Sequence, residues 1–464
     1  MSVIRRGAAW LLAVTAMALC ALAGGVHRAR CASEGPSDTT PQTETVAQWP
    51  WNTRAFCTPQ LARDDAHPCW SPDGQRLAFA ARNGGQMRLF LFDPASSRTT
   101  RLAPSVEGAS HPSWSGDGRL IAFGGSPQGS GDLFVVDVRS GDLTELTEGP
   151  DDDFAPEYVP GGDAVLFQRT VTDPGAGAAV THLCIVSSGD RSVTCLTDEI
   201  VEKDGSGKVD EPPIWLTSVA PRGGGILACL VPGPDAPFVW DPAGAEWEPL
   251  HSQVMPAWSP DGKRLVYVTD NGSAPSQRLV IRAVGQGSPE EVLLELPREA
   301  GSVGAVAWAP TGDRIALAYG AEPRGVGGVP PGGDVRYVAG IASASGGRFE
   351  LVKGRPRALG CMPRWSPDGS TLAVSRCCAE DVGVDPALVP PSGVDLLSVQ
   401  GGIRVRELTV DALVNLDLTW SPSGEWLAWA ADYGDRQEVT VARADGSEVV
   451  ELRRLVEQAA ERDQ

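Results

Sequence analysis

One short phrase recurs along the chain and constrains its fold more than any other feature. In its fullest form it reads Trp-Ser-Pro-Asp-Gly and precedes a short apolar run, as at 70–74, 258–262 and 365–369. Proline presets the backbone of a tight turn, and glycine supplies the left-handed residue that joins the turn to the next strand. Each copy therefore predicts the first hairpin of an antiparallel sheet.

Eight copies of the phrase occur, five of them clear and three degenerate. Glycine closes the turn in all eight copies, whereas the second copy lacks the proline. The first and last anchors, Trp70 and Trp420, are 350 residues apart over seven intervals, which gives about 50 residues per repeat. The structural residues of the repeat are Trp70, Gly74, Trp114, Gly118, Gly162, Gly223, Trp258, Gly262, Trp308, Gly312, Trp365, Gly369, Trp420 and Gly424.

A second pair of short strand-like runs follows most copies, and no helical pattern separates the repeats. Four strands per repeat and this repeat length predict an all-β fold. The prediction is a β-propeller of four-stranded antiparallel blades, with eight blades and with seven as the alternative. A large aromatic residue at one fixed strand position is expected to pack between adjacent blades rather than to bind a ligand.

The N-terminus has the pattern of an export signal. Arg5 and Arg6 precede an uncharged run over 7–25, which is typical of a signal peptide and is also nearly long enough for a membrane anchor. The predicted division is a signal peptide or anchor at 1–23, a flexible linker at 24–50, the propeller at 51–455 and a C-terminal tail at 456–464.

Two ways of closing the ring fit the sequence. In one, the segment 54–59 completes the last blade, and 449–461 is helical. In the other, 448–452 is the outer strand of the last blade itself.

Ten cysteines are present without a Cys-x-x-Cys pair, so neither a zinc nor a thioredoxin-like motif is supported. Export permits disulfides. Two pairs flank predicted hairpin turns, and we predict cross-strand disulfides for Cys184 with Cys195 and for Cys361 with Cys377.

The repeated phrase resembles the TolB-like, WD-like propeller repeat family, over roughly 57–455. Members of that family include the periplasmic TolB proteins, which bind partner proteins in the cell envelope, and propellers attached to serine peptidases. The chain departs from TolB in having eight repeats rather than six and no room for its N-terminal α/β domain. The resemblance implies a propeller that binds a partner rather than the TolB role itself.

The longest predicted loops are at 170–181, 320–336 and 379–394, with a long link at 198–212. Strand alternation places all four on one face, which we expect to bind the ligand. His67 and His111 occupy equivalent positions in adjacent blades near this face, with Asp65 and Asp153 upstream of first strands. These four residues are the predicted ligand-binding site, for a metal or a cationic peptide; the alternative is that the histidines only pack against the following proline.

The segment 202–213 has oxygen-bearing residues at alternate positions, in the manner of a calcium loop. Its metal-ligand candidates are Glu202, Asp204, Ser206 and Asp210. The twelfth position is Pro213 rather than glutamate, which favours a plain loop. No cofactor is therefore expected, with calcium as the alternative.

The net charge of −20 disfavours nucleic acid as a partner. A nucleophile-elbow Gly-x-Ser-x-Gly motif is absent from the sequence. The leading hypothesis is a non-enzymatic scaffold that binds a protein or peptide of the cell envelope, in the periplasm or outside the cell. It contacts the membrane only if its N-terminal segment stays uncleaved as an anchor. The alternative is a propeller enzyme, or the propeller partner of a hydrolase, acting on a peptide or glycan.

Overall fold

The computed structural model describes residues 67–126, 130–173, 178–197, 214–221, 226–230, 238–241, 246–252, 254–270, 277–285, 287–296, 302–320, 336–354, 359–377, 393–399, 404–409, 412, 414–433 and 436–462. The chain divides into two compact units, Met1–Gln48 and Trp49–Gln464, and every described residue belongs to the second. The N-terminal signal and linker, the closing segment 54–59, Asp65, Gly223 and the four calcium-ligand candidates lie outside the described residues.

The described strands form eight sheets, each of four antiparallel strands that follow one another in the chain. This confirms the predicted all-β propeller, with eight blades. Blades 1 to 4 comprise β1 Cys69–Trp70, β2 Leu77–Asn83, β3 Gln86–Asp93 and β4 Arg98–Arg101; β5 Ser110–Trp114, β6 Leu120–Gly125, β7 Asp132–Asp137 and β8 Leu143–Glu145; β9 Asp152–Tyr158, β10 Ala164–Asp173, β11 Ala178–Ser187 and β12 Val193–Cys195; and β13 Ile214–Val219, β14 Ile226–Leu230, β15 Phe238–Asp241 and β16 Glu246–Pro249.

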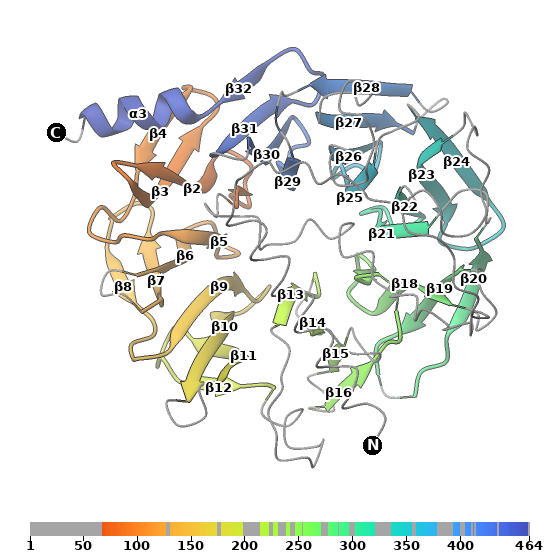
Figure 1. Ribbon diagram of the computed structural model, residues 1–464, viewed down its shortest axis with the longest axis horizontal. Helices are drawn as coiled ribbons and strands as arrows, with labels where there is room; N and C mark the ends of the chain where they lie inside the picture. Colours follow the sequence, from red (N-terminus) through yellow and green to blue (C-terminus); the bar gives the residue numbers. More distant parts are fainter. Residues whose placement is uncertain are drawn as a thin grey trace, which may run out of the picture. The chain divides into compact units, whose positions relative to one another are not determined.

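Blades 5 to 8 comprise β17 Ala257–Trp258, β18 Arg264–Asp270, β19 Gln277–Ala283 and β20 Glu291–Glu295; β21 Ser302–Trp308, β22 Arg314–Gly320, β23 Arg336–Ser343 and β24 Phe349–Gly354; β25 Leu359–Trp365, β26 Thr371–Cys377, β27 Gly393–Ser398 and β28 Arg404–Thr409; and β29 Val414–Trp420, β30 Trp426–Asp432, β31 Gln437–Arg443 and β32 Val449–Glu451. Helix α3, Arg453–Arg462, follows the last strand. The blades succeed one another around a ring, with the first strand of each blade nearest the centre (Figure 1).

The Ser-Pro-Asp-Gly turn is held by its own side chains. In blade 1, the Ser71 hydroxyl donates to Asp73 Oδ1 at 2.5 Å, and the Gly74 N–H donates to the Ser71 carbonyl at 2.8 Å. The serine hydrogen bond is the main cause that lowers the pKa of Asp73 below its usual value. The left-handed residue is the predicted glycine in six blades: Gly74, Gly118, Gly262, Gly312, Gly369 and Gly424.

Blade 3 differs from this pattern, and the prediction for Gly162 is wrong. The left-handed residue there is Gly161, with φ of 80°. The turn of blade 3 reads Pro160-Gly161, and glycine directly after proline favours a type II turn, which needs positive φ one residue earlier.

The repeated tryptophans join neighbouring blades, as predicted. The Trp114 indole N–H donates to the Cys69 carbonyl of blade 1 at 3.1 Å, and the Trp70 indole donates to the Thr419 carbonyl of blade 8 at 3.3 Å. The acceptor is in both cases the residue before the tryptophan of the preceding blade. Two more tryptophans repeat this bond: Trp365 to Ala307 and Trp420 to Arg364, each at 3.1 Å.

Arginine six residues after the tryptophan covers the tryptophan of the next blade. Arg76 lies over the ring of Trp114 and Arg264 over that of Trp308, at 5.7 and 5.0 Å from the ring centroids. These are cation–π contacts, and the arginine stem also covers the ring. In blade 7 this position is Thr371, and the next tryptophan, Trp420, stays partly exposed.

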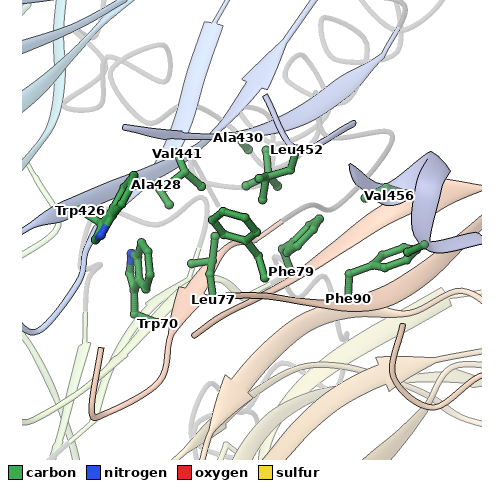
Figure 2. Packing of buried hydrophobic residues seen from close by; sticks show 13 residues of the cluster. Trp70, Leu77, Phe79, Phe90, Trp426, Ala428, Ala430, Val441, Leu452 and Val456 are labelled. Carbon is green, nitrogen blue, oxygen red and sulfur yellow. The ribbon is translucent and has the colours of Figure 1, made fainter. Parts of the chain in front are cut away.

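Blades 8 and 1 close the ring by side-chain packing. Trp426 occupies the position that arginine holds in other blades and lies beside Trp70 (Figure 2). Helix α3 lies against blade 1, and its Val456 packs in the same cluster as Phe79 and Phe90. The outer strand of blade 8 is β32, and helix α3 follows it. The predicted tail at 456–464 is therefore largely part of this helix, because its apolar residues repeat at helical spacing.

The remaining predictions concern the long loops and the two disulfides. The segment predicted as a loop at 170–181 instead extends β10 and β11, which pair from Thr170 with Thr181 to Asp173 with Ala178. The β-branched residues at 170–172 and 180–181 favour this extension. The other predicted loops lie mostly outside the described residues.

Cys184 lies opposite Cys195 and is joined to it in a disulfide, as the hairpin predicted. The second predicted pairing is not found in the register of blade 7. There Cys361 lies opposite Ser375, and Leu359 lies opposite Cys377, so the two cysteines are not cross-strand partners. The register at the turn, where Trp365 pairs with Leu372, would place Cys361 opposite Arg376, and the bulge in β25 moves it one residue further from Cys377.

No helix among the described residues has the length and apolar composition to cross a bilayer.

Candidate functional site

A bulge recurs in the first strand, three residues before the repeated aromatic residue. Residues at this position adopt a left-handed backbone in four successive blades: Asp417 in blade 8, His67 in blade 1, His111 in blade 2 and Ala155 in blade 3, with φ from 29° to 53°. Register shifts mark the bulge in β5, β9 and β29. This conformation is strained for residues with a side chain, and bulges redirect side chains. Because the same backbone conformation occurs at the equivalent position in four blades, it is a regular feature of the repeat.

The bulge brings side chains from three blades together. The imidazoles of His67 and His111 stack with ring centroids 3.7 Å apart and an angle of 27° between their planes. On its other side, His67 Nδ1 lies 3.1 Å from Asp417 Oδ2. His67 thus contacts a carboxylate from blade 8 and a second imidazole from blade 2.

Arg364 of blade 7 adds a fourth group. Burial raises the pKa of Asp417, but the charges of His67, His111 and Arg364 lower it by more, so the carboxylate stays ionised. Desolvation lowers the pKa of Arg364, and the Asp417 charge only partly opposes it. We call Arg364, Asp417, His67 and His111 the inner arc. Each of these four residues comes from a different one of four successive blades.

Further polar groups lie on the inner strands of blades 1 to 3. The residue directly before the aromatic residue reaches the next blade: the Cys69 thiol donates to the Pro112 carbonyl at 2.8 Å, and Ser113 Oγ accepts the Tyr158 N–H at 3.0 Å. In blade 3 this residue is Glu157. Burial raises its pKa to about 7, although a backbone hydrogen bond from Val219 opposes the shift.

Two other blades have apolar residues at the equivalent position. In blades 5 and 6, the residues before the tryptophan are Ala257 and Ala307. The polar residues described above thus come from blades 7, 8, 1, 2 and 3, and the apolar ones from blades 5 and 6. A site with convergent polar groups on one side and apolar groups on the other is typical of a ligand-binding site.

The structure places the predicted ligand-binding residues in different surroundings. His67 and His111 are in contact, as their equivalent positions suggested. Asp153 is buried and binds Arg169 through both oxygens, at 2.7 and 2.8 Å, so it lies in an ion pair between β9 and β10 and not beside the histidines. The described residues contain no group of three His, Cys, Asp or Glu side chains arranged to hold a metal ion.

Asp417 and Arg364 were missed from the sequence, although the signal was present. Asp417 precedes Trp420 by the same three residues that separate His67 from Trp70. Aligning all copies on the aromatic residue would have placed Asp417 beside the histidines, provided that blade 8 meets blade 1. Arg364 needs the bulge geometry as well, because it stands directly before Trp365.

Several solved structures are similar to this one, at low sequence identity. An oligogalacturonate lyase in complex with manganese has 12% identity and a TM-score of 0.47, and covers 73% of this chain and 90% of its own. The propeller of Dos1 has 11% identity and a TM-score of 0.49, with 80% and 90% covered. TolB from Acinetobacter baumannii has 15% identity and a TM-score of 0.36; the match covers 81% of this chain and 62% of the TolB chain. At these values the similarities carry no conclusion about function.

No curated protein matches the sequence. A family model does match: residues 60–214 fit the TolB beta propeller domain. This span holds blades 1 to 3, including His67, His111 and the three inner strands that position them. The resemblance noted in the repeats is thereby confirmed over residues 60–214, which match the model of the TolB beta propeller domain.

Proposed function

We propose that the chain is an exported, non-enzymatic propeller that binds a protein or peptide partner at the inner arc. The observation that carries the proposal is a strained backbone that recurs in successive blades and gathers the two imidazoles of His67 and His111 and the Asp417 carboxylate from separate repeats, with the Arg364 guanidinium acting on that carboxylate. Strained residues of this kind cluster at ligand sites. The inner strands begin at the face that carries the links between blades, so a partner on that face has access to the arc.

Binding suits this arrangement better than catalysis. The His67 imidazole contacts the Asp417 carboxylate through Nδ1 and stacks its ring on that of His111, so both contacts hold its orientation. The four groups offer hydrogen bonds and charges of both signs, which recognise a polar partner.

The test is recovery of a partner from a cell-envelope extract by the immobilised protein. The variant carries His67→Asn and Arg364→Gln; asparagine tolerates the left-handed backbone. The matched control carries Arg139→Gln and Arg348→Gln, two exposed arginines in turns at the opposite ends of the strands. We expect wild type and control to retain the same partner and the inner-arc variant to lose it.

Equal recovery by all three proteins would overturn the inner arc as the binding site. The same preparations also test the absence of catalysis, with peptide and glycan substrates. Turnover by wild type that the inner-arc variant lacks would replace the scaffold with the enzyme alternative.

A further inference from the structure

A second polar surface lies between blades 2 and 3, on the face where the inner strands begin. Five carboxylates meet there: Asp132 at the start of β7, Glu145 at the end of β8, Glu148 in the link to blade 3, and Asp152 and Asp153 at the start of β9. We call these five residues the acidic patch. Glu148 and Asp152 are exposed, Glu145 is half-buried, and Asp132 and Asp153 are buried beneath them.

The backbone of the patch is fixed by hydrogen bonds between the two blades. The Gly131 N–H donates to Asp152 Oδ1 at 2.9 Å, and the Asp153 N–H donates to the Gly131 carbonyl at 2.7 Å. Arg169 acts on both buried carboxylates, and it is engaged by both oxygens of Asp153. The positive charge within the patch is therefore already committed to Asp153.

Asp132 is the unusual member of the patch. Its side chain is 6% exposed, and its buried Oδ1 accepts no hydrogen bond. Burial is the first cause that raises the pKa of Asp132 to about 6; Glu145, Asp153 and Glu148 raise it further, and Arg169 opposes them. At neutral pH the residue is thus an ionised, buried carboxylate surrounded by like charges, which is rare and unfavourable without a cation.

We propose that the acidic patch binds a lysine or arginine side chain from a basic segment of a protein partner. Either side chain has a long apolar stem, so its charge can reach a recessed carboxylate while the stem passes the exposed Glu148 and Asp152. A single cation there would form charge-assisted hydrogen bonds and reduce the repulsion among the carboxylates. The proposal deepens the proposed function by naming the partner's chemistry, and it concerns a surface separate from the inner arc.

The experiment uses a fluorescent tetralysine peptide and the matching tetraserine peptide, titrated with the full-length protein. The patch variant carries Asp132→Asn and Glu148→Gln. The control variant carries Glu291→Gln and Glu425→Gln, which removes the same charge from exposed positions in blades 5 and 8. This control is essential because a chain of net charge −20 attracts any polycation.

We expect wild type and control to bind tetralysine equally and the patch variant to bind it at least about tenfold more weakly, the usual effect of losing a charge-assisted contact. Tetraserine should not bind. Binding by wild type should strengthen between pH 5 and 7.5 as Asp132 ionises among Glu145, Glu148, Asp153 and Arg169, and the patch variant should lack this rise.

Equal affinities of the two variants, whether both weakened or both unchanged, would overturn the proposal in favour of attraction to the overall charge. The inner-arc variant should bind tetralysine like wild type. Tetralysine binding therefore tests the acidic patch alone, and recovery of the envelope partner tests the inner arc. A failure of one proposal can thus be distinguished from a failure of the other.

Discussion

Replacing Leu452 with aspartate is expected to lower the free energy of unfolding by at least about 4 kcal/mol. Leu452 is fully buried where β32 passes into helix α3, in one cluster with Trp70, Phe79 and Val456. The substitution removes a large apolar side chain and places a carboxyl group among aromatic and aliphatic neighbours. The described parts of blades 8 and 1 share no strand, so side-chain contacts hold the ring closed: this cluster, the Trp70 bond to Thr419 and the contact of His67 with Asp417.

Equilibrium denaturation followed by tryptophan fluorescence measures the effect. The matched control is Arg454→Asp, which places the same charge two residues away on the exposed side of the helix. That substitution should change the free energy of unfolding by no more than about 0.5 kcal/mol. If Leu452→Asp were as mild as the control, helix α3 would not close the ring.

The propeller is expected to lose stability as the pH rises from about 4.5 to about 7, with Glu157 as the main cause. Its pKa is raised from 4.5 in the unfolded chain to about 7 in the folded one. The folded state therefore binds the proton more tightly, so this contribution is complete below pH 4.5 and is lost as the pH rises through 7. One pKa unit corresponds to about 1.4 kcal/mol, and we expect about 2 kcal/mol after allowing for the exposed part of the side chain.

Glu157→Gln keeps an acceptor for the Val219 N–H and removes the titration, so most of the decline should disappear. A smaller decline in the same direction remains from Asp132, whose pKa is raised to about 6. Thermal unfolding midpoints of wild type, Glu157→Gln and the exposed control Glu291→Gln, taken from pH 4.5 to 8, measure the difference. Parallel curves for all three proteins would contradict the burial of Glu157.

The turn aspartates act in the opposite sense at lower pH. Serine hydrogen bonds lower the pKa of Asp73, Asp117, Asp261 and Asp368. Their contribution is present above the unfolded pKa and is lost as the pH falls through the lowered one. Together with Glu157, they place the maximum stability of the propeller on the acidic side of neutrality.

The local features of the fold were predictable because they depend on neighbouring residues. Proline, aspartate and glycine within one turn determine the hairpin, and the tryptophan beside it determines the contact between blades. Gly161 was misjudged because two adjacent glycines both permit a left-handed backbone, and the turn type decides between them. Helix α3 was one of two alternatives, since the choice depends on where blade 1 lies relative to a segment almost 400 residues away.

The candidate site was only partly predictable, for a related reason. The equivalence of His67 and His111 is visible in the repeat, but contact between their rings requires the bulge, which no residue type specifies. Asp417 joins them only because blade 8 meets blade 1. Asp153 is a residue type that can bind a cation from a ligand. In the structure, Arg169 lies opposite Asp153 in the register of β9 and β10 and binds its carboxylate.

The contact between His67 and His111 tests most directly whether successive blades converge at the inner arc. The chain has five histidines, so selective isotope labelling of histidine in a deuterated protein gives a simple spectrum, which His67→Asn and His111→Asn assign. With ring centroids 3.7 Å apart, the two imidazoles should show a strong nuclear Overhauser effect between their ring protons. A folded protein in which these two rings give no such effect would contradict the inner arc.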